Sequence, residues 1–384
     1  MKIVIAGTSY PYRGGLAAYN ERLARQFIAE GDTVDIITFK LQYPSFLFPG
    51  KTQFSEAAPP QGLKIRRLMN SVNPFNWIRT GLIIRRMRPE ILILKYWLPF
   101  MGPCFGTIAR IASGNRYTKV ICIFDNVIPH EKRTGDRLLT RYFLKPLHAA
   151  IAMSEKVMID FSSFRPTIPV RLSPHPLFDN FGHDPGKEAS AAYLGLNSDN
   201  SYILFFGFIR AYKGLDLLLE AFASSHTRSD GKARLIVAGE FYENDEPYMK
   251  IIEERQLRDD VVLIKRFIND DEVKYLFGVA DLVVQPYRNA TQSGVTQIAY
   301  HFSKPMIVTD VGGLREIVPD GRCGFVVKAD SADIAKAIDR FYTGEFTAAF
   351  TEGIREEKAR YGWDRMTSAV KDLYKNITKD DNKK

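Results

Sequence analysis

Short apolar runs alternate along almost the whole chain with segments in which apolar residues recur at helical spacing. Nearly continuous apolar runs are typical of buried parallel strands, and strands that alternate with helices indicate βαβ units. In the first half, the runs that predict strands are residues 2–6 (KIVIA), 33–39 (TVDIITF), 91–94 (ILIL), 119–124 (KVICIF) and 148–154 (HAAIAMS). Helical spacing extends from residues 14–15 to Gly31, and another helix is predicted to begin at Pro74 and end before Pro89.

The second half repeats this architecture. Its predicted strands are residues 202–208, 234–239, 261–267, 281–287, 305–310 and 324–328, and its predicted helices include 214–223, 271–280, 332–342, 347–360 and 364–376. Residues 178–201, rich in Gly, Asp, Asn and Ser, read as a loop and as the domain boundary. The pattern therefore predicts an α/β protein of two Rossmann-like, doubly wound domains that face a cleft, over residues 1–180 and 200–362.

Composition limits the class of protein to which the chain can belong. A chain of 384 residues suits two domains, and 45% hydrophobic with 25% charged residues excludes disorder of the whole chain. No apolar run approaches the about 20 residues that span a bilayer. The three cysteines form no CxxC pair, so a disulfide framework and a cysteine-rich zinc site are not expected. We expect a cytoplasmic protein, either soluble or on a membrane surface.

Charge is unevenly distributed. Residues 1–190 hold 26 Lys and Arg against 14 Asp and Glu, a net +12, whereas residues 191–384 hold 27 against 30, a net −3. A basic half indicates an anionic partner such as nucleic acid, anionic lipid headgroups or a phosphorylated substrate, unless it is only a solvated basic surface.

Two segments of the second half have the chemistry of a phosphate site. In GFIRAYKGLDLLLEA (207–221), Arg210 and Lys213 come directly before a predicted helix. Cations are unexpected there, because a helix N-terminus favours anions. A diphosphate bound between the two cations and the helix would explain their position, and a solvated basic turn is the alternative. In NATQSGVTQ (289–297), Gln292, Ser293 and Gly294 open a helix with small residues that allow close approach to backbone N–H groups. An ordinary strand-to-helix turn is the alternative there.

The first half offers weaker signals. Gly14 and Gly15 precede a helix beside Arg13, but the segment is not GxGxxG, and a simple turn explains it equally well. Asp125, His130 and Glu131 follow a strand and are candidates for acid–base or sugar-binding work. The chain contains no HExxH, DxD, GxSxG or P-loop, which disfavours zinc hydrolysis, α/β-hydrolase chemistry and P-loop phosphoryl transfer.

At these motifs the sequence resembles the retaining glycosyltransferases of family four, which have the GT-B fold. The resemblance covers nearly the whole chain and rests on GTSYPYRGGLAAYNERLARQF, FFGFIRAYKGLDLLLEAF and ADLVVQPY with QSGVTQIAYHFSKPMIVTDVGGLREIV. The final GWDRMTSAVKDLYKNI looks like the terminal helix of that fold, so that residues 364–384 would return to the first domain.

The resemblance implies a nucleotide-diphosphate sugar bound by the second domain and a glycan or lipid-linked acceptor on the first, in bacterial cell-surface polysaccharide or glycan assembly. Arg210 and Lys213 would neutralise the diphosphate and stabilise it as the leaving group. No protein nucleophile and no metal cofactor are implied. The remaining implied donor-site residues are Gly14, Gly15, Gly207, Glu240, Phe267, Ile268, Gln292, Ser293, Gly294, Val295 and Gln297, and those implied on the acceptor side are Arg13, His130 and Glu131.

The sequence departs from the family pattern at two places. Family members commonly carry two glutamates eight positions apart. This chain has Thr291 or Gln292 at the first of these positions and Ile298 or Ala299 at the second. Gln297 is the candidate that would replace the hydrogen bond to ribose. They also commonly have a histidine near the donor sugar, where this chain has Asp125.

Basic residues gather between positions 64 and 95. They are Lys64, Arg66, Arg67, Arg79, Arg85, Arg86, Arg88 and Lys95. The predicted helix 74–88 also places four apolar residues beside this charge, namely Trp77, Ile78, Leu82 and Ile84. Basic amphipathic helices with Trp commonly lie on anionic membrane surfaces, and the aromatic stretch 43–54 could enter the same interface. The hypothesis is a membrane-presented acceptor reached from the inner face of the plasma membrane; the alternative is that Trp77 and its neighbours belong to the core.

Three other readings stay open. A GT-B-like sugar-nucleotide epimerase would need acid–base groups that are scarce in 289–300. A sugar-nucleotide-binding protein without turnover would fit the two departures. Nucleic-acid binding is not expected, because no recognised motif accompanies the basic charge.

Overall fold

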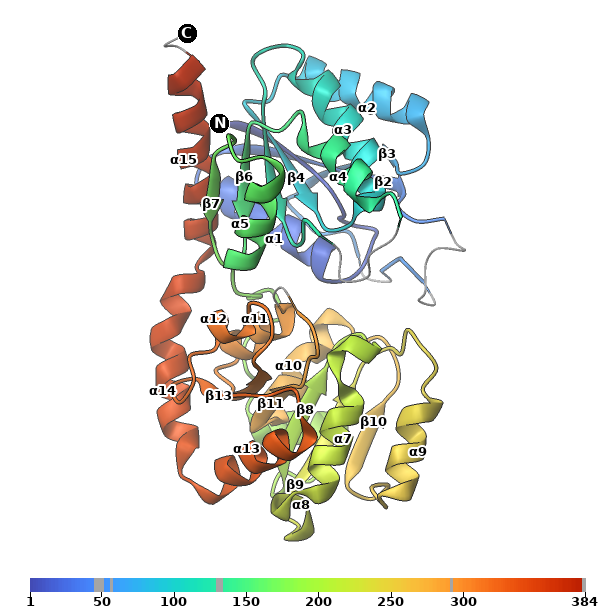
Figure 1. The fold of residues 1–384 in the computed structure, drawn as a ribbon, viewed down its shortest axis with the longest axis vertical. Helices are drawn as coiled ribbons and strands as arrows, with labels where there is room; N and C mark the ends of the chain where they lie inside the picture. Colours follow the sequence, from blue (N-terminus) through green and yellow to red (C-terminus); the bar gives the residue numbers. More distant parts are fainter. Residues whose placement is uncertain (45–51, 56–57, 129–133, 291–292, 382–384) are drawn as a thin grey trace. The chain divides into compact units, whose positions relative to one another are not determined.

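The computed structural model describes residues 1–44, 52–55, 58–128, 134–290 and 293–381. The chain forms two compact units, drawn as a ribbon in Figure 1. Unit 1 comprises Met1–Pro176 and Gly362–Lys384, and unit 2 comprises Leu177–Tyr361. Unit 2 is therefore an uninterrupted segment inserted into the sequence of unit 1.

Unit 1 is built on a seven-stranded parallel sheet in the order β3-β2-β1-β4-β5-β6-β7. Its elements are β1 (Lys2–Ala6), α1 (Gly15–Ala29), β2 (Thr33–Leu41), β3 (Lys64–Asn70), α2 (Pro74–Met87), β4 (Ile91–Tyr96), η2 (Pro99–Met101), α3 (Gly102–Ser113), β5 (Lys119–Phe124), α4 (Asp136–Leu144), β6 (Ala149–Ala152), α5 (Glu155–Phe164), β7 (Val170–Leu172) and α15 (Trp363–Asp381). This is the Rossmann strand order, extended by one strand.

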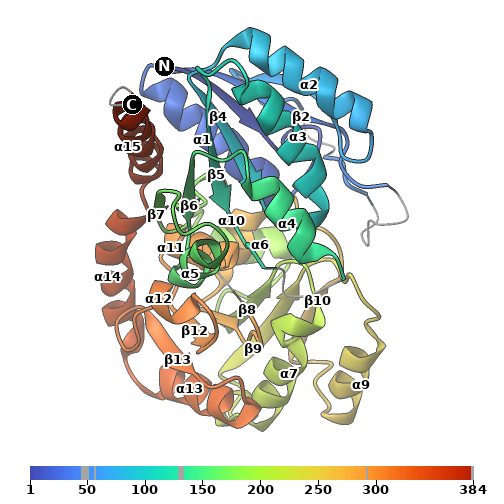
Figure 2. The ribbon, with the colours of Figure 1, turned by 45° about the horizontal axis from the view of Figure 1, so that its top comes forward.

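Alternate residues of β4 face opposite sides of the unit 1 sheet. Leu92, Leu94 and Tyr96 join the hydrophobic core that residues of α2, α3, α4 and α5 complete. Helices α2, α3 and α4 follow one another across this side, as Figure 2 shows. Lys95 therefore points to the other side, where α1 lies, and Lys95 Nζ is 3.7 Å from the centre of the Tyr19 ring.

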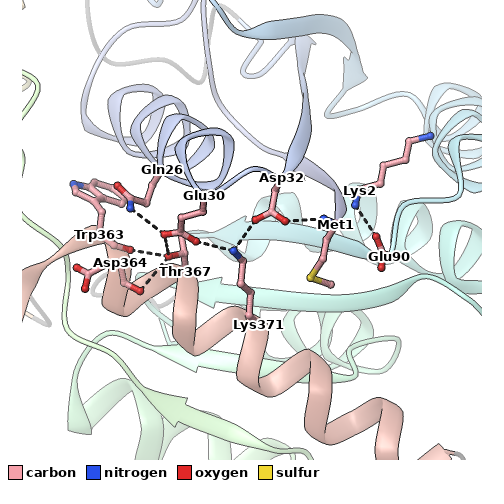
Figure 3. A network of polar contacts seen from close by, with 10 residues as sticks. All are labelled: Met1, Lys2, Gln26, Glu30, Asp32, Glu90, Trp363, Asp364, Thr367 and Lys371. Carbon is pink, nitrogen blue, oxygen red and sulfur yellow. Dashed lines mark hydrogen bonds and ion pairs between the residues drawn. The ribbon is translucent and has the colours of Figure 1, made fainter.

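Helix α15 packs against α1, β5 and β6 of unit 1. An apolar stripe at helical spacing lies buried on it, formed by Trp363, Met366, Ala369, Val370, Leu373 and Ile377. Polar contacts flank the stripe: Lys371 Nζ is 2.7 Å from both Glu30 and Asp32, and the Thr367 hydroxyl donates to Glu30 at 2.6 Å (Figure 3). The last helix is therefore a structural part of the first unit.

Unit 2 is built on a six-stranded parallel sheet in the order β10-β9-β8-β11-β12-β13. Its elements are α6 (Lys187–Leu194), β8 (Ser201–Phe206), η3 (Ala211–Lys213), α7 (Leu215–Ser224), α8 (His226–Ser229), β9 (Ala233–Ala238), α9 (Glu246–Glu254), β10 (Val261–Ile264), α10 (Asp270–Val279), β11 (Leu282–Gln285), α11 (Gly294–His301), β12 (Met306–Thr309), α12 (Leu314–Ile317), β13 (Gly324–Val327), α13 (Ser331–Thr343), α14 (Phe346–Lys358) and η4 (Ala359–Tyr361).

The predicted α/β class with two doubly wound sheets is confirmed. The segment 178–201 is not wholly a loop, because α6 lies within it and packs on α10 of unit 2. In both sheets the strand order reverses beside the first strand of the unit, between β1 and β4 and between β8 and β11. Ligands of such sheets bind at the carboxyl ends of the strands at this switch point.

Candidate functional site

The carboxyl ends of β8 and β9 come very close together in unit 2. Gly207 follows β8 with φ +102°, and Gly239 follows β9 so closely that a Cβ on it would lie 2.0 Å from the Gly207 carbonyl oxygen. The Ile209 amide donates to the Glu240 carbonyl at 2.9 Å and carries the pairing beyond the strands. Only glycine fits at either position, so bare backbone lies at the switch point.

The loop after Gly207 is held against the end of β11. Gly214, at φ +69°, approaches the Pro286 carbonyl so closely that a Cβ would lie 2.0 Å from its oxygen. Arg288 binds Asp216 through its guanidinium at 2.5 Å and donates its backbone N–H to the Tyr212 carbonyl at 2.7 Å. These contacts fix the short helix η3, which begins after Arg210 and carries Lys213.

Lys213 is a buried cation without an anionic partner among the described residues. Its side chain lies beside Gly207, where a Cβ would be 3.1 Å from Lys213 Nζ, and Nζ is 5.6 Å from the centre of the Tyr287 ring. Burial, and then the neighbouring Arg210, lower the pKa of Lys213 to about 8. Two cations that repel each other here indicate a site for an anion.

The N-terminus of α11 also lies beside Gly207. A Cβ on Gly207 would be 3.7 Å from Val295 Cγ2. Ser293 caps the helix, because its buried hydroxyl accepts from the Val295 N–H at 3.2 Å, and Gly294 packs against the Phe178 ring. The positive end of this helix dipole and the two cations are therefore gathered at the switch point between β8 and β11, an arrangement that suits a diphosphate.

Aromatic side chains gather where β8, β9 and β10 end. The Phe208 ring lies 4.5 Å from that of Tyr242 and 6.0 Å from that of Phe267, and the Arg210 guanidinium lies 5.2 Å from the centre of the Tyr242 ring. Phe267 was among the predicted residues; Phe208 and Tyr242 were missed, because an aromatic residue after a strand reads equally well as core. These rings offer a flat apolar surface beside the cations.

The remaining predicted residues of unit 2 have different surroundings. Glu240 and Ile268 are buried in the segments that follow β9 and β10. Gln297 is completely buried within α11, and neither its amide nitrogen nor its oxygen has a hydrogen-bond partner among the described residues. Ile298 and Ala299, at the second family glutamate position, are buried too. Gln292 lies outside the described residues.

In unit 1, Gly14 has φ +96° and is the N-cap of α1, whose first residue is Gly15. The Arg13 amide donates to the Gln53 carbonyl at 3.1 Å. Asp125 directly follows β5 and pairs with Lys95 at 2.8 Å. His130 and Glu131 lie outside the described residues.

The basic surface of unit 1 differs from the predicted one in three residues. Lys95 is 1% exposed and is no part of the surface. Trp77 packs on the core and donates its indole N–H to the Asn70 carbonyl at 2.7 Å, and Ile84 is buried. These apolar side chains bind the helix to the sheet. Of the predicted apolar residues, Ile78 (45%) and Leu82 (38%) are exposed, and Phe75 (83%) is a further exposed apolar residue of α2.

Within the described ranges, no cluster of three or more His, Cys, Asp and Glu side chains could hold a metal ion. In the same part of the chain, every helix is too short or too polar to cross a bilayer.

Two solved structures share this architecture. Sucrose-phosphate synthase from Thermosynechococcus elongatus superposes with a TM-score of 0.74 over 98% of this chain and 99% of that one, at 15% identity. Anabaena Alr3699/HepE in complex with UDP and glucose gives 0.73 over 98% and 100%, also at 15% identity. At such low identity the likeness shows the fold, which is the GT-B fold of two parallel α/β domains.

Sequence comparison gives a family match in unit 2. Residues 186–358 match the model of the family described as Glycosyl transferases group 1. A D-inositol 3-phosphate glycosyltransferase of Saccharomonospora viridis is 31% identical over 201 residues, which are 50% of this chain and 46% of that protein. The match thus spans about half the length of that relative. The protein of the same name from Frankia alni is 26% identical over 94% of both chains.

Proposed function

We propose that the chain is a retaining glycosyltransferase of family four, which transfers a sugar from a nucleotide-diphosphate sugar to a glycan or lipid-linked acceptor. The observation that carries the proposal is Lys213, a buried ammonium without an anionic partner in the described part of unit 2, beside Arg210 and the N-terminus of α11. A diphosphate would neutralise both cations and accept hydrogen bonds from the helix.

The same geometry supplies a mechanism. As the bond between the sugar and the diphosphate breaks, negative charge develops on the leaving oxygen. Arg210 and Lys213 are held in place by the packing of η3 against the end of β11, so they would stabilise that charge without reorganisation. Two fixed cations would take the place that a divalent metal has in other transferases, and we propose that no metal cofactor is needed. Cell-surface glycan assembly is the proposed setting.

A ligand screen tests the proposal. UDP, GDP, ADP and their common sugar conjugates are each added at saturating concentration, and the melting temperature is measured. UDP and UDP-glucose come first, because HepE, which shares the fold, binds UDP and glucose. A ligand at 100 times its Kd should add about 2.7 kcal/mol of stability. Arg210→Ala should abolish the shift, whereas Arg234→Ala, an exposed arginine outside the site, should keep it. No shift with any nucleotide would contradict the proposal.

We further propose that unit 1 places the enzyme on an anionic membrane surface, as a peripheral protein of the inner face of the plasma membrane. The exposed Phe75, Ile78 and Leu82 on α2 lie among Arg79, Arg85 and Arg86. Neither α2 nor α3 contains an acidic residue, and α3 packs between α2 and α4. Exposed side chains of α4 continue the surface with Leu138 (71%), Tyr142, Arg137 and Arg141. An apolar stripe bordered by arginines is typical of interfacial helices.

Vesicle flotation tests this attachment. The protein is expected to float with vesicles that contain anionic lipid at low salt, and not with neutral vesicles or at high salt. Ile78→Ser with Leu82→Ser should reduce flotation several-fold, because apolar burial is lost. Ile28→Ser is the matched control, since Ile28 is 39% exposed on α1, across the sheet. Equal flotation of all variants would exclude α2 as the contact.

A further inference from the structure

Unit 1 contains an ion pair that is buried at one end and exposed at the other. Lys95 is the penultimate residue of β4, Asp125 directly follows β5, and Lys95 Nζ lies 2.8 Å from Asp125 Oδ1. The two strands pair in parallel, and the Asp125 amide donates to the Tyr96 carbonyl at 3.0 Å. The lysine side chain is 1% exposed and the aspartate side chain is 19% exposed. Ligands can therefore reach the carboxylate but not the ammonium.

Among the described residues, the Asp125 carboxylate is the only anionic group in contact with the Lys95 ammonium. This ammonium lies over the Tyr19 ring and 3.7 Å from the Met153 sulfur. The buried His175 also faces this region, and burial, together with Lys95, lowers the pKa of His175 to about 3, so the imidazole is neutral. Burial lowers the pKa of Lys95 and Asp125 opposes that change. Cys122 on β5 is buried, and burial raises its pKa, so it stays a thiol.

Stability does not explain a lysine at this position. Ile91 and Ile93, which point to the same side of β4, are completely buried apolar residues. A buried ion pair is often no better for stability than apolar residues of similar volume. Function does offer an explanation, because the pair lies at the carboxyl end of the sheet, beside the switch point between β1 and β4. Gly7, directly after β1, would place a Cβ 3.6 Å from Lys95 Cβ.

We propose that Lys95 is a positioning residue that fixes the Asp125 carboxylate as the acceptor of a hydrogen bond from a sugar hydroxyl of the substrate. The inference rests on the proposed glycosyltransferase function. An ammonium 2.8 Å away orients the carboxylate, and a charged carboxylate accepts hydroxyl hydrogen bonds more strongly than a neutral group. Lys95 itself contacts no substrate. The pairing of β4 with β5 holds both partners on one rigid element, as a preorganised site requires.

Three variants test this role: Lys95→Met, Asp125→Asn and the double variant. Asp125→Asn leaves the buried Lys95 ammonium without its partner, and Lys95→Met leaves the partly exposed Asp125 carboxylate without its partner, so the melting temperature should fall in both single variants. The double variant removes both charges, and its melting temperature should return to that of the wild type or above. Turnover is measured as nucleoside diphosphate release from the nucleotide sugar selected by the ligand screen. All three variants should lose about a hundredfold in kcat/KM, because misplaced contacts cost that much. Binding of UDP should be unchanged, because the diphosphate cations lie in unit 2.

The double variant separates positioning from a structural role. If the pair were only structural, its activity would return together with its melting temperature. Wild-type activity in Lys95→Met or in the double variant would overturn the inference while leaving the proposed function intact. A wild-type protein that binds nucleotide sugars but never turns them over would instead overturn the proposed transfer activity, and this inference with it.

Discussion

At the scale of single residues, Lys213 shows how a functional group weakens the fold that carries it. Its ammonium is buried beside Arg210, and in the described chain no carboxylate lies within ion-pair distance. An uncompensated buried charge costs folding free energy that apolar neighbours do not return. Structural residues are seldom arranged in this way, so the cost itself points to a ligand.

Replacing Lys213 should therefore separate stability from binding. Lys213→Met keeps the length and apolar stem of the side chain but removes the charge. We expect the ligand-free protein to gain roughly 1–3 kcal/mol in unfolding free energy and to lose nucleotide binding. Chemical denaturation and calorimetric titration measure the two effects. A variant that was less stable and still bound nucleotide would show that Lys213 has a structural role only.

The pKa of about 8 for Lys213 predicts opposite pH dependences for binding and for stability. The contribution of Lys213 to nucleotide affinity should be constant below pH 8. Above pH 8 the affinity should fall, because binding must then be accompanied by protonation of the lysine. Calorimetry at pH 9 in buffers of different ionisation enthalpy should reveal proton uptake. The unfolded lysine has a pKa of about 10.4. Because the unfolded state binds more protons between these values, the stability of the ligand-free protein should rise from about pH 8 to pH 10.4. Lys213→Met should show neither effect.

The sequence could identify only part of this chemistry. Arg210 and Lys213 were predicted because two cations before a helix oppose its dipole. Lys95 was assigned to a basic surface, although it interrupts an apolar strand, because lysine is rarely buried. The sequence left open whether Trp77 and Ile84 lie at a membrane surface or in the core, because a helix that mixes arginines with apolar residues does not show which of them face the sheet. Glycine contacts such as that of Gly239 with Gly207 depend on strand pairing, which the sequence does not specify.

At the scale of elements, the strands and helices that were predicted lie within a few residues of the observed ones, whereas α3, α4, α5 and β7 were not individually predicted. Strand β3 was missed, because its sequence KIRRLMN is basic and only Met69 in it is fully buried, at the edge of the sheet. Helix α6 was missed, because eight residues rich in alanine lie between Gly- and Asp-rich segments. Short elements of this kind depend on tertiary contacts, which a local pattern does not contain.

Helix α15 should control the stability of unit 1 alone. Met366 is completely buried in its apolar stripe, so Met366→Ala should cost about 2–5 kcal/mol. Native-state hydrogen exchange should show lower protection in the strands of unit 1 and unchanged protection in those of unit 2. Lys375→Ala, at an exposed position of the same helix, is the control and should change neither. Lower protection in both units would mean that they unfold as one cooperative body.

At the scale of the whole molecule, the insertion of unit 2 into unit 1 makes the two units unequal. Residues 177–361 include a complete sheet with its own hydrophobic core. We expect this segment to fold when expressed alone and to bind nucleoside diphosphate with an affinity close to that of the full chain, because Arg210, Lys213 and Ser293 all belong to it. Calorimetric titration of both proteins with UDP checks this. A folded fragment that does not bind would show that unit 1 residues are needed for the diphosphate.

The position of α15 also sets an order of events during synthesis. Ribosomes release a chain from its N-terminus, so β1 to β7 emerge first, but α15, which packs against α1, β5 and β6, is translated only after all of unit 2. Until then the surface that receives Val370 and Leu373 stays open to water. Unit 2 has no such delay, since its residues are contiguous. The half of the gene translated first therefore encodes the unit that is completed last, and a nascent chain that pauses within unit 2 would present an unfinished apolar surface to chaperones.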